Sequence, residues 1–307
     1  QCLYMMYNRF AELRFVKSGI KIGGANFWNG NEIEKPLHIS FNCSMKAESK
    51  PNDAEVTILN LSNQTAKKVF VEGEEIELWG GYKPQGQQEF LGLIFKGKIR
   101  SVITNREGVN IKTVVKIGDG DEAHTHATVK KKVPKGSYKG QVDAAAEAME
   151  KRGVKRGTIK VDDKEVGRTL TFNGDSARQI LDDVAFATDS VWMITNGKLH
   201  FHKRDEALQD SKYVLTPENG LLGSPVFSDD GVQIKTLLIH DLRPSMKITV
   251  RSLGAGNPRI NASYKIEDIT FNGTNAEGEH GCDIKLKEIG TNGKVKRKKQ
   301  RQSGGRT

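Results

Sequence analysis

The sequence predicts a mainly β protein of the α+β class, with two antiparallel β-barrel domains and a small α/β domain between them. The first observation is a long succession of short segments in which apolar and polar residues alternate, each ending at a turn signal. The second is the composition, because 32 glycines and 36% hydrophobic residues fit a chain rich in short strands and turns. The third is that clear helical periodicity is confined to the middle of the chain.

The first β domain, with the arm that precedes it, is assigned to residues 1–133. In LHISFNCSM, which begins at Leu37, the apolar residues occupy alternate positions and therefore lie on one face of a strand. A short helical turn follows the next strand, and Ser62 is placed to cap it. Residues 13–118 hold some six or seven such strands, and their regular spacing is typical of a small antiparallel barrel or split barrel.

The α/β domain is assigned to residues 134–205, after the run Lys130–Lys132 that reads as a linker. The segment SYKGQVDAAAEAMEKRGV has apolar residues at helical spacing and ends at Gly153, a residue typical of a helix C-terminus. A strand and a second helix follow. The pair Asn196–Gly197 between two strand-like segments is the strongest short signal for a β-hairpin.

The second β domain is assigned to residues 206–290, and its strands match those of the first domain. The segments FKGKIRSVITNREGVNIKTVV and YKIEDITFNGTNAEGEHGCDIKL share a layout of strand, turn and strand. EEIELWGGY and MKITVRSL occupy matching places before them. We therefore expect that the second β domain is a duplicate of the first, although the sequence identity between them is weak.

The net charge of +10 is concentrated at the end of the chain. Residues 291–307 contain seven cationic residues and no acid, so the remaining residues carry only +3. A basic tail of this composition cannot bury enough apolar surface to fold alone. We expect it to dock on an acidic surface of an adjoining protein. The residues assigned to that contact are Lys294, Lys296, Arg297, Lys298, Lys299 and Arg301.

Candidate catalytic residues do not form a recognisable set. Asp229 and Asp230 precede Gly231, and this order predicts a turn that leads into the second β domain, since adjacent carboxylates on a strand would point to opposite faces. We expect no enzymatic activity and no cofactor.

Metal and disulfide sites are not expected either. His124 and His126 would share one face of a strand, yet no further ligand lies nearby, so a polar face is the preferred interpretation. The alternation of His200 and His202 around a Phe likewise indicates a solvated face. Three cysteines far apart indicate ordinary reduced thiols, and no apolar segment is long enough for a membrane span.

The phrases "PNDAEVTILNLSNQT", "LTFNGDSARQILDDVAFATDSVWMITNGKLHF" and "LLGSPVFSDDGVQIKTLLIHDLRPSMKITV", in this order, resemble the baseplate hub proteins of contractile-tailed bacteriophages. The resemblance extends over residues 13–290. Such hubs are related to the N-terminal part of type VI secretion spike proteins, and their two barrels are similar to tail-tube subunits.

This resemblance implies a structural role in the virion, at the baseplate of the tail tip, after assembly in the bacterial cytoplasm. It implies a homotrimer that adapts the hexameric tail tube to the trimeric cell-puncturing spike. The expected partners are the tube or its initiator protein, the spike and other baseplate proteins, and DNA only during passage through the channel. Two alternatives stay open: a tail-associated cell-wall hydrolase, and a nucleic-acid-binding module that acts through the basic tail.

Overall fold

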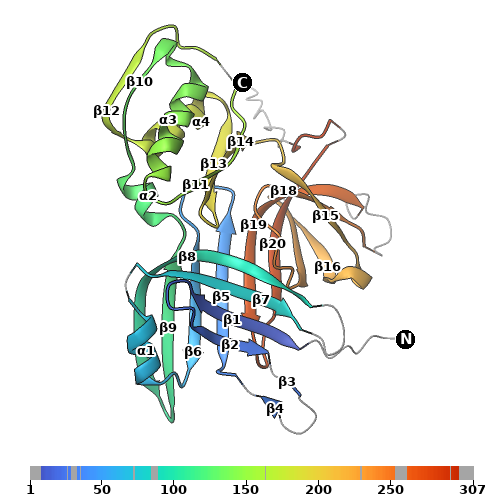
Figure 1. Cartoon of the computed structure of the whole chain (residues 1–307). Coiled ribbons are helices and arrows are strands. Elements are labelled where there is room, and N and C mark those ends of the chain that lie inside the picture. Colours follow the sequence, from blue (N-terminus) through green and yellow to red (C-terminus); the bar gives the residue numbers. More distant parts are fainter. Residues whose placement is uncertain are drawn as a thin grey trace, which may run out of the picture.

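The computed structural model describes residues 8–25, 27–28, 33–34, 36–71, 73–83, 89–162, 164–228, 230–252, 261–290 and 292–296. Three lobes are visible in Figure 1: two β lobes side by side, and an α/β lobe above them. In the described part of the chain, no helix has both the length and the apolar character needed to cross a membrane.

The first β lobe is built from the strands that precede residue 119. In the sheet they follow the order β2-β1-β7-β8-β9-β6-β5, and every neighbouring pair is antiparallel. Alternate residues of β5 and β6 are buried, as the sequence pattern predicts. Helix α1 begins after Ser62, whose hydroxyl oxygen accepts a hydrogen bond from the Thr65 N–H at 3.1 Å, so the predicted cap is confirmed. The elements are β1 (Arg9–Phe15), β2 (Lys21–Ala25), β5 (Ile39–Lys46), β6 (Asp53–Leu59), α1 (Asn63–Val69), β7 (Glu75–Tyr82), β8 (Phe90–Glu107) and β9 (Asn110–Gly118), with the small pair β3 (Phe27–Trp28) and β4 (Ile33–Glu34) beside them.

The second β lobe follows the α/β lobe in the chain. Its strands have the order β16-β17-β20-β19-β18-β15, and only the β15–β18 pair is parallel. The elements are β15 (Gln209–Leu215), η2 (Pro217–Asn219), β16 (Leu221–Ser228), β17 (Gly231–Leu237), β18 (Met246–Val250), β19 (Ala262–Thr274) and β20 (Gly281–Glu288).

The two β lobes belong to one 13-stranded sheet, because β19 pairs with β5. The first part of β19 pairs with β18, from Ala262 to Lys265, and the second part pairs with β5, from Asp268 to Thr274. One hydrophobic core extends through both lobes. The mainly β fold with an α/β unit between two β regions is therefore confirmed. The structure adds that the two curled regions share the β19–β5 ladder. Since β19 occupies the second edge of β5, this edge cannot pair with β2 to close a barrel.

The predicted duplication is visible in the strand order. The strands β5 to β9 lie in the order β5-β6-β9-β8-β7, and β16 to β20 lie in the same order, β16-β17-β20-β19-β18. Both hairpins carry a bulge at the same place, between Ile99 and Ser101 in β8 and between Ile266 and Asp268 in β19. Pairing across each unit gives two equivalent rows of residues: Ile99, Ile117, Ala54 and Cys43 in the first lobe, and Ile266, Leu286, Val232 and Phe227 in the second.

The α/β lobe has a hydrophobic core of its own, made by residues between Ala123 and Phe201. Strand β10, which the sequence analysis assigns to the first β domain, pairs with β12 and buries Val129 and Val133 in this core. We therefore place the start of the lobe near Gly120 and not at residue 134. The elements are α2 (Asp121–His126), β10 (Thr128–Val133), η1 (Pro134–Gly136), α3 (Tyr138–Glu150), β11 (Lys155–Ile159), β12 (Leu170–Ser176), α4 (Ala177–Ala187), β13 (Ser190–Thr195) and β14 (Lys198–Lys203).

Helix α3 is the predicted central helix. The Ser137 hydroxyl accepts a hydrogen bond from the Gly140 N–H at 3.0 Å and so caps its first turn. Val142, Ala145 and Met149 are fully buried on its inner face. The helical spacing of these residues therefore reflects packing against the lobe's own core.

Candidate assembly interface

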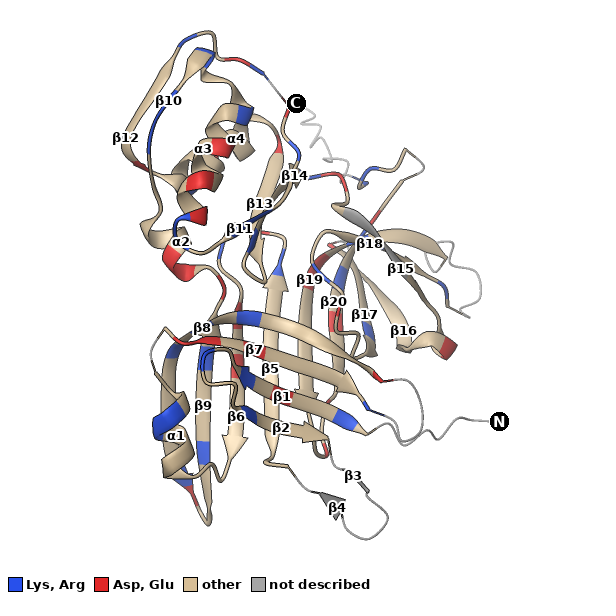
Figure 2. Cartoon of the chain, viewed as in Figure 1, with Lys and Arg blue, Asp and Glu red and all other residues tan. Residues whose placement is uncertain are grey.

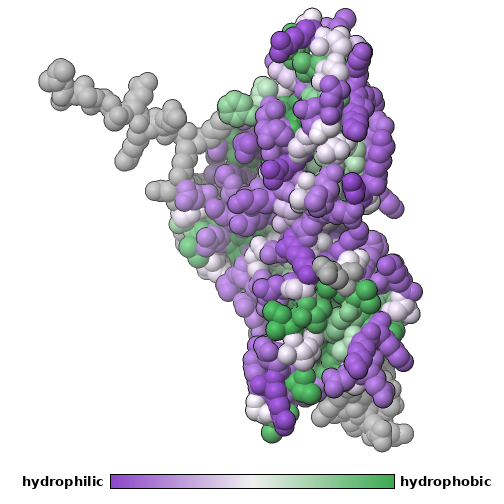
Figure 3. Space-filling model, turned by 90° about the vertical axis from the view of Figure 1, so that its left-hand side faces the viewer, coloured by the Kyte–Doolittle hydropathy of each residue, from purple (hydrophilic) through white to green (hydrophobic). Residues whose placement is uncertain are grey.

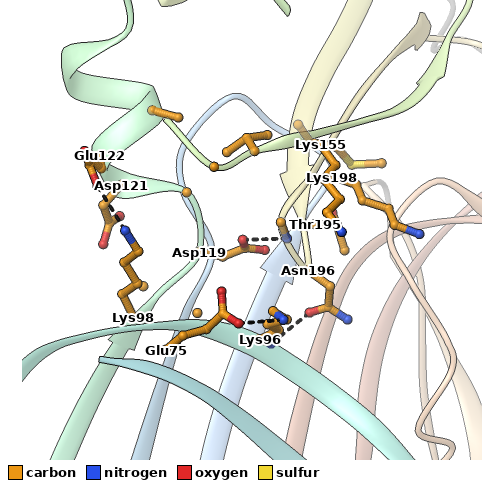
Figure 4. Close-up of a pocket in the computed structure, with 18 of the residues that line it drawn as sticks. Glu75, Lys96, Lys98, Asp119, Asp121, Glu122, Lys155, Thr195, Asn196 and Lys198 are labelled. Carbon is orange, nitrogen blue, oxygen red and sulfur yellow. Dashed lines mark hydrogen bonds and ion pairs between the residues drawn. The ribbon is translucent and has the colours of Figure 1, made fainter. Parts of the chain in front are cut away.

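The α/β lobe is attached to the first β lobe through the tip of the β13–β14 hairpin. Asn196 and Gly197 at this tip have φ angles of 50° and 72°, the left-handed backbone that a tight two-residue hairpin requires. The Asn196 side-chain oxygen accepts a hydrogen bond from the Lys96 N–H at 3.1 Å (Figure 4), and its amide nitrogen donates to the Ile94 carbonyl at 3.3 Å. The hairpin that the sequence predicts is therefore also a docking element.

Two buried polar residues hold the other side of the same tip. The Asn52 side-chain nitrogen donates to the Ile194 carbonyl at 2.8 Å, while its oxygen accepts from the Lys46 N–H at 3.0 Å. Asp119 accepts a hydrogen bond from the Gly197 N–H at 2.9 Å (Figure 4). Because buried polar groups are costly unless they are paired, these bonds fix the position of the hairpin on the β lobe.

Asp119 is the carboxyl group most perturbed by this arrangement. Its side chain lies in the junction, and the residue is only 1% exposed. Burial raises the pKa of Asp119 to about 7, although hydrogen bonds from the backbone of Gly197 and Asn196 oppose the shift. The Oδ2 atom has no hydrogen-bond partner among the described residues. The junction therefore contains a group that changes charge near neutral pH.

A cavity of about 1180 Å³ lies beside this junction, between the α/β lobe and the β lobes. Several of its charged lining residues pair with one another: Lys96 contacts Glu75 at 2.7 Å, and Lys98 contacts Glu122 at 3.0 Å (Figure 4). Arg100 forms a two-bonded ion pair with Asp121, with both bonds at 2.5 Å. The pairs of Lys98 and Arg100 connect β8 to the start of α2, so these charges serve the attachment of the lobes.

The side of the shared sheet that faces away from the core is polar and continuous across both β lobes. We call it the polar face, and it includes Asn42, Glu55, Lys116, Lys235, Asn272 and Asp283. The Asn42 amide donates to Asn272 at 2.6 Å, and the Asn272 amide donates to Asp283 at 3.0 Å. Lys235 pairs with Asp283 at 3.2 Å. Figure 2 shows basic and acidic residues interspersed along the strands of both lobes.

Four strands of the shared sheet have an edge without a partner strand in the described part of the chain: β2, β15, β16 and the second half of β8. The β7–β8 ladder ends at the Glu75–Lys98 pair, so the second half of β8, from Ser101 to Glu107, is paired only with β9. At the other end of the sheet, β16 pairs only with β17. Free strand edges of this kind are templates for pairing with another chain.

Exposed apolar side chains accompany these edges. Ile103 of β8 is 48% exposed, and Leu222 and Val226 of β16 are 45% and 61% exposed. Figure 3 shows hydrophobic residues gathered on the side of the first β lobe where α1 and the β8–β9 hairpin lie in Figure 1. Exposed apolar groups beside a free edge indicate a contact surface.

The structure places only part of the predicted basic site. Lys294 contacts Asp205 at 3.4 Å, and Lys296 forms an ion pair with Glu288, so both cations are engaged by acids of their own chain. A short backbone bridge between Ile289 and Val295 supports this return of the chain. The contact with an adjoining protein stays a prediction for all six residues, of which Arg297, Lys298, Lys299 and Arg301 lie outside the described ones.

The histidine interpretations need correction. His124 and His126 lie on helix α2 and not on a strand, so they do not share a face, and the His124 ring packs near Trp192 at 5.8 Å between centroids. His202 is fully buried and not solvated, because the second β lobe covers that side of β14. Among the described residues, no group of three or more His, Cys, Asp or Glu side chains is arranged to hold a metal ion.

The described residues of the predicted turn at the start of the second β lobe form the tip of the β16–β17 hairpin. Ser228 pairs with Gly231 across the β16–β17 hairpin, and the Asp230 N–H donates to the Ser228 hydroxyl at 3.3 Å. Asp229 lies outside the described residues. Pro225 sits inside β16, where the register with β17 shifts, and an edge strand tolerates proline there.

The sequence over residues 15–279 matches the family described as Baseplate hub gp41. The chain belongs to this family. The resemblance to baseplate hub proteins is thus confirmed, and with it a structural role in a bacteriophage tail. No curated protein matches the sequence.

Solved tail proteins have the same fold at very low sequence identity. The 43 kDa tail protein of prophage MuSo2 from Shewanella oneidensis is 9% identical with a TM-score of 0.59, and the match covers 91% of this chain and 98% of that one. A tail protein from Neisseria meningitidis is 10% identical with a TM-score of 0.56, over 91% and 96% of the two chains. A type VI secretion component from E. coli, described as similar to the T4 tail proteins gp27 and gp5, is 9% identical with a TM-score of 0.55, over 87% and 78%.

Sequence reasoning missed the residues that join the lobes. Asn52 follows Pro51 and reads as an ordinary loop residue, and Asp119 stands between two glycines as a turn residue would. Only Asn196–Gly197 gave a signal, and that signal concerned the local turn alone. The free edges were also missed, since strand order cannot be obtained from alternation within single strands.

Proposed function

We propose that three copies of this hub form a ring that joins a sixfold tail tube to a threefold spike. The observation that carries the proposal is the repeated five-strand unit, β5 to β9 and β16 to β20. A chain with two equivalent units supplies six units in a trimer, so the ring has threefold true symmetry and sixfold pseudosymmetry. Cyclic closure needs different edges on the two sides of each chain, and β8 and β16 are such edges.

The polar face is proposed to line the DNA channel of this ring. Its cations are partly neutralised by neighbouring acids, as in the pairs Lys116–Glu55 and Lys235–Asp283. A surface with compensated charge and short polar side chains does not hold phosphates strongly, because strong binding requires unpaired cations that displace counterions. DNA is therefore proposed to be a transient occupant of the channel.

The α/β lobe is proposed to lie on the outer side of the ring and to contact neighbouring baseplate proteins. It interrupts the chain between the two β units, and the tip of its β13–β14 hairpin docks on the first of them. The basic residues Lys294, Lys296, Arg297, Lys298, Lys299 and Arg301 are proposed to bind an acidic surface of the spike or of a tube-side neighbour. Assembly is proposed to take place in the bacterial cytoplasm, and the contractile type of tail follows from the resemblance alone.

A structural role without catalysis is part of the proposal. It is supported by the structural character of the family and by the use of the buried polar residues Asn52 and Asp119 in lobe attachment. The hydrolase alternative predicts that the purified chain releases fragments from bacterial cell walls. Such release, at a rate that depends on a particular acidic side chain, would favour that alternative.

The oligomeric state is tested by light scattering on the purified hub and by images of the tail tip. The expected results are a mass three times that of the chain and threefold density between tube and spike. A monomer within the virion, or a ring of six copies of this chain, would refute the symmetry-adaptor proposal.

A further inference from the structure

The junction between the two β lobes shows how two such units join. Beyond its bulge, β19 leaves β18 and pairs with β5 over seven residue pairs, from Asp268–Lys46 to Thr274–Ser40. Phe271 lies opposite Cys43 on the core side of this ladder, and Asn272 lies opposite Asn42 on the polar face. The joint is therefore one strand beyond a bulge, added to the first strand of the next unit.

Each participant in this joint has an unpaired equivalent elsewhere in the chain. The equivalent of β19 is β8, whose segment beyond the bulge, Ser101–Glu107, is paired on one side only. The equivalent of β5 is β16, which pairs only with β17 among the described strands. One chain therefore contains one complete joint and the two separated halves of a second.

We propose that Ser101–Glu107 of β8 pairs antiparallel with β16 of a second copy of this chain, repeating the β19–β5 joint. The proposal rests on the proposed ring, and it specifies how neighbouring copies in that ring are joined. The register follows from the equivalent rows described above. Because Phe271 faces Cys43, Thr104 is expected to face Phe227 of the neighbouring copy, with Asn105 opposite Val226 and Ile103 opposite Ser228.

The exposure of the two edges agrees with this pairing. In the complete joint, Phe271 and Cys43 are fully buried, whereas Thr104 is exposed and Phe227 is half-buried. Val226 is 61% exposed and Ile103 is 48% exposed, and both lie in the proposed ladder. Pairing would bury Thr104 and Phe227 on the core side, and on the polar face it would cover the flanks of Ile103 and Val226 with side chains of the neighbouring copy, which favours association.

Pro225 limits the length of the proposed ladder. Gly223, Ser224 and Pro225 form the irregular part of β16, between its two pairing regions with β17. Proline has no N–H to donate, so regular pairing is expected to stop on reaching this segment. The joint between copies is therefore shorter than the joint within the chain, and it should be the weaker of the two.

Cysteine cross-linking tests the pairing and its register. Residues directly opposite in an antiparallel ladder have Cα atoms about 4.5–5.5 Å apart, which is within the range that a disulfide spans. The variant N105C/V226C, oxidised in the full-length hub, is expected to give covalent dimers and closed trimers on non-reducing gels. N105C/L222C is the off-register control, because Leu222 lies on the far side of Pro225, and it should cross-link at a level at least tenfold lower. Oxidised wild type gives the background from the native cysteines.

A charge substitution gives an independent readout. T104E places a carboxylate on the core side of the proposed ladder, opposite Phe227 of the neighbouring copy, at a position that is exposed within one copy, so the fold should be kept while the trimer is lost in light scattering. V109E is the matched control at the hairpin tip, where the side chain is 91% exposed and outside the ladder, and it should remain trimeric.

The outcomes separate this proposal from the ring itself. If the wild-type hub is a trimer but N105C/V226C gives no specific cross-link and T104E remains trimeric, the strand pairing is overturned and the ring stays intact. Specific cross-links that continue into products longer than trimers would support the pairing and refute the closed ring. A wild-type hub that stays monomeric at high concentration without cross-links would count against both.

Discussion

Replacing Asp119 with asparagine should make the hub more stable at neutral pH. The carboxyl is buried at the lobe junction, where its pKa is raised to about 7 from an ordinary value of 3.8. Between these two values the folded chain holds a proton that the unfolded chain has released, so the free energy of unfolding falls as pH rises. A shift of about 3 pKa units corresponds to a loss of about 4 kcal/mol by pH 8, as an upper bound. An amide in its place can still accept the Gly197 N–H and carries no charge to desolvate.

Urea unfolding of wild type and D119N from pH 4 to pH 8 measures this effect. The buried His202 and His280 and the half-buried His200 act in the opposite direction, because burial lowers their pKa values to about 4, and their contribution makes stability rise up to about pH 6.5. The difference between the two proteins cancels this contribution. It should be within about 1 kcal/mol at pH 4 and should grow toward about 4 kcal/mol in favour of D119N by pH 8.

D183N is the control for an Asp-to-Asn change at an exposed site, on α4. A difference between wild type and D119N that stays constant over the whole pH range would show that the Asp119 carboxyl does not carry a charge penalty in the folded hub. Burial at the lobe junction would then not raise the pKa of Asp119.

Three further changes test the remaining parts of the molecule. N196A removes two hydrogen bonds between the hairpin tip and β8, and it should lower the free energy of unfolding in urea by about 1–3 kcal/mol. The control N219A, in the exposed turn η2, should lower it by less than about 0.5 kcal/mol. Replacing residues 121–203 with a short Gly-Ser linker should leave both β lobes folded by circular dichroism and block baseplate completion; normal infectious particles would contradict the role given to the α/β lobe. Removing residues 297–307 should keep the trimer and weaken attachment to the acidic partner, with the largest defect relative to wild type at low salt, where the contact of the intact hub is least screened; full tails at normal yield would show that these residues are dispensable.

Local features of the fold could be predicted from the sequence because single segments encode them. Alternation placed β5 and β6, helical spacing placed α3, and Asn196–Gly197 placed a hairpin. The duplication was visible as a repeated order of strands and turns, since it preserves layout even where identity is lost. These signals depend on neighbours within a few residues, and tertiary context rarely reverses them.

The relations between lobes could not be predicted in the same way. His202 follows the alternation of a half-exposed strand, yet a second lobe covers it, and nothing within β14 reports that lobe. The residues His124 and His126 were placed on a strand because six residues are too few to show helical periodicity. The pairing of β19 with β5 depends on which edge remains open after each lobe has curled, which is a property of the assembled sheet.

The ladder between β5 and β19 has a consequence for synthesis of the chain. Asn42 and Asn272, which meet in it, are 230 positions apart. At about 5–20 residues per second, a ribosome needs roughly 10–50 s to add the intervening residues. During that interval β5 has emerged with an open edge and apolar neighbours, and its strand partner does not yet exist. The nascent hub is therefore most vulnerable to aggregation late in translation, and its yield should depend on host chaperones that occupy exposed strand edges until the last β unit has emerged.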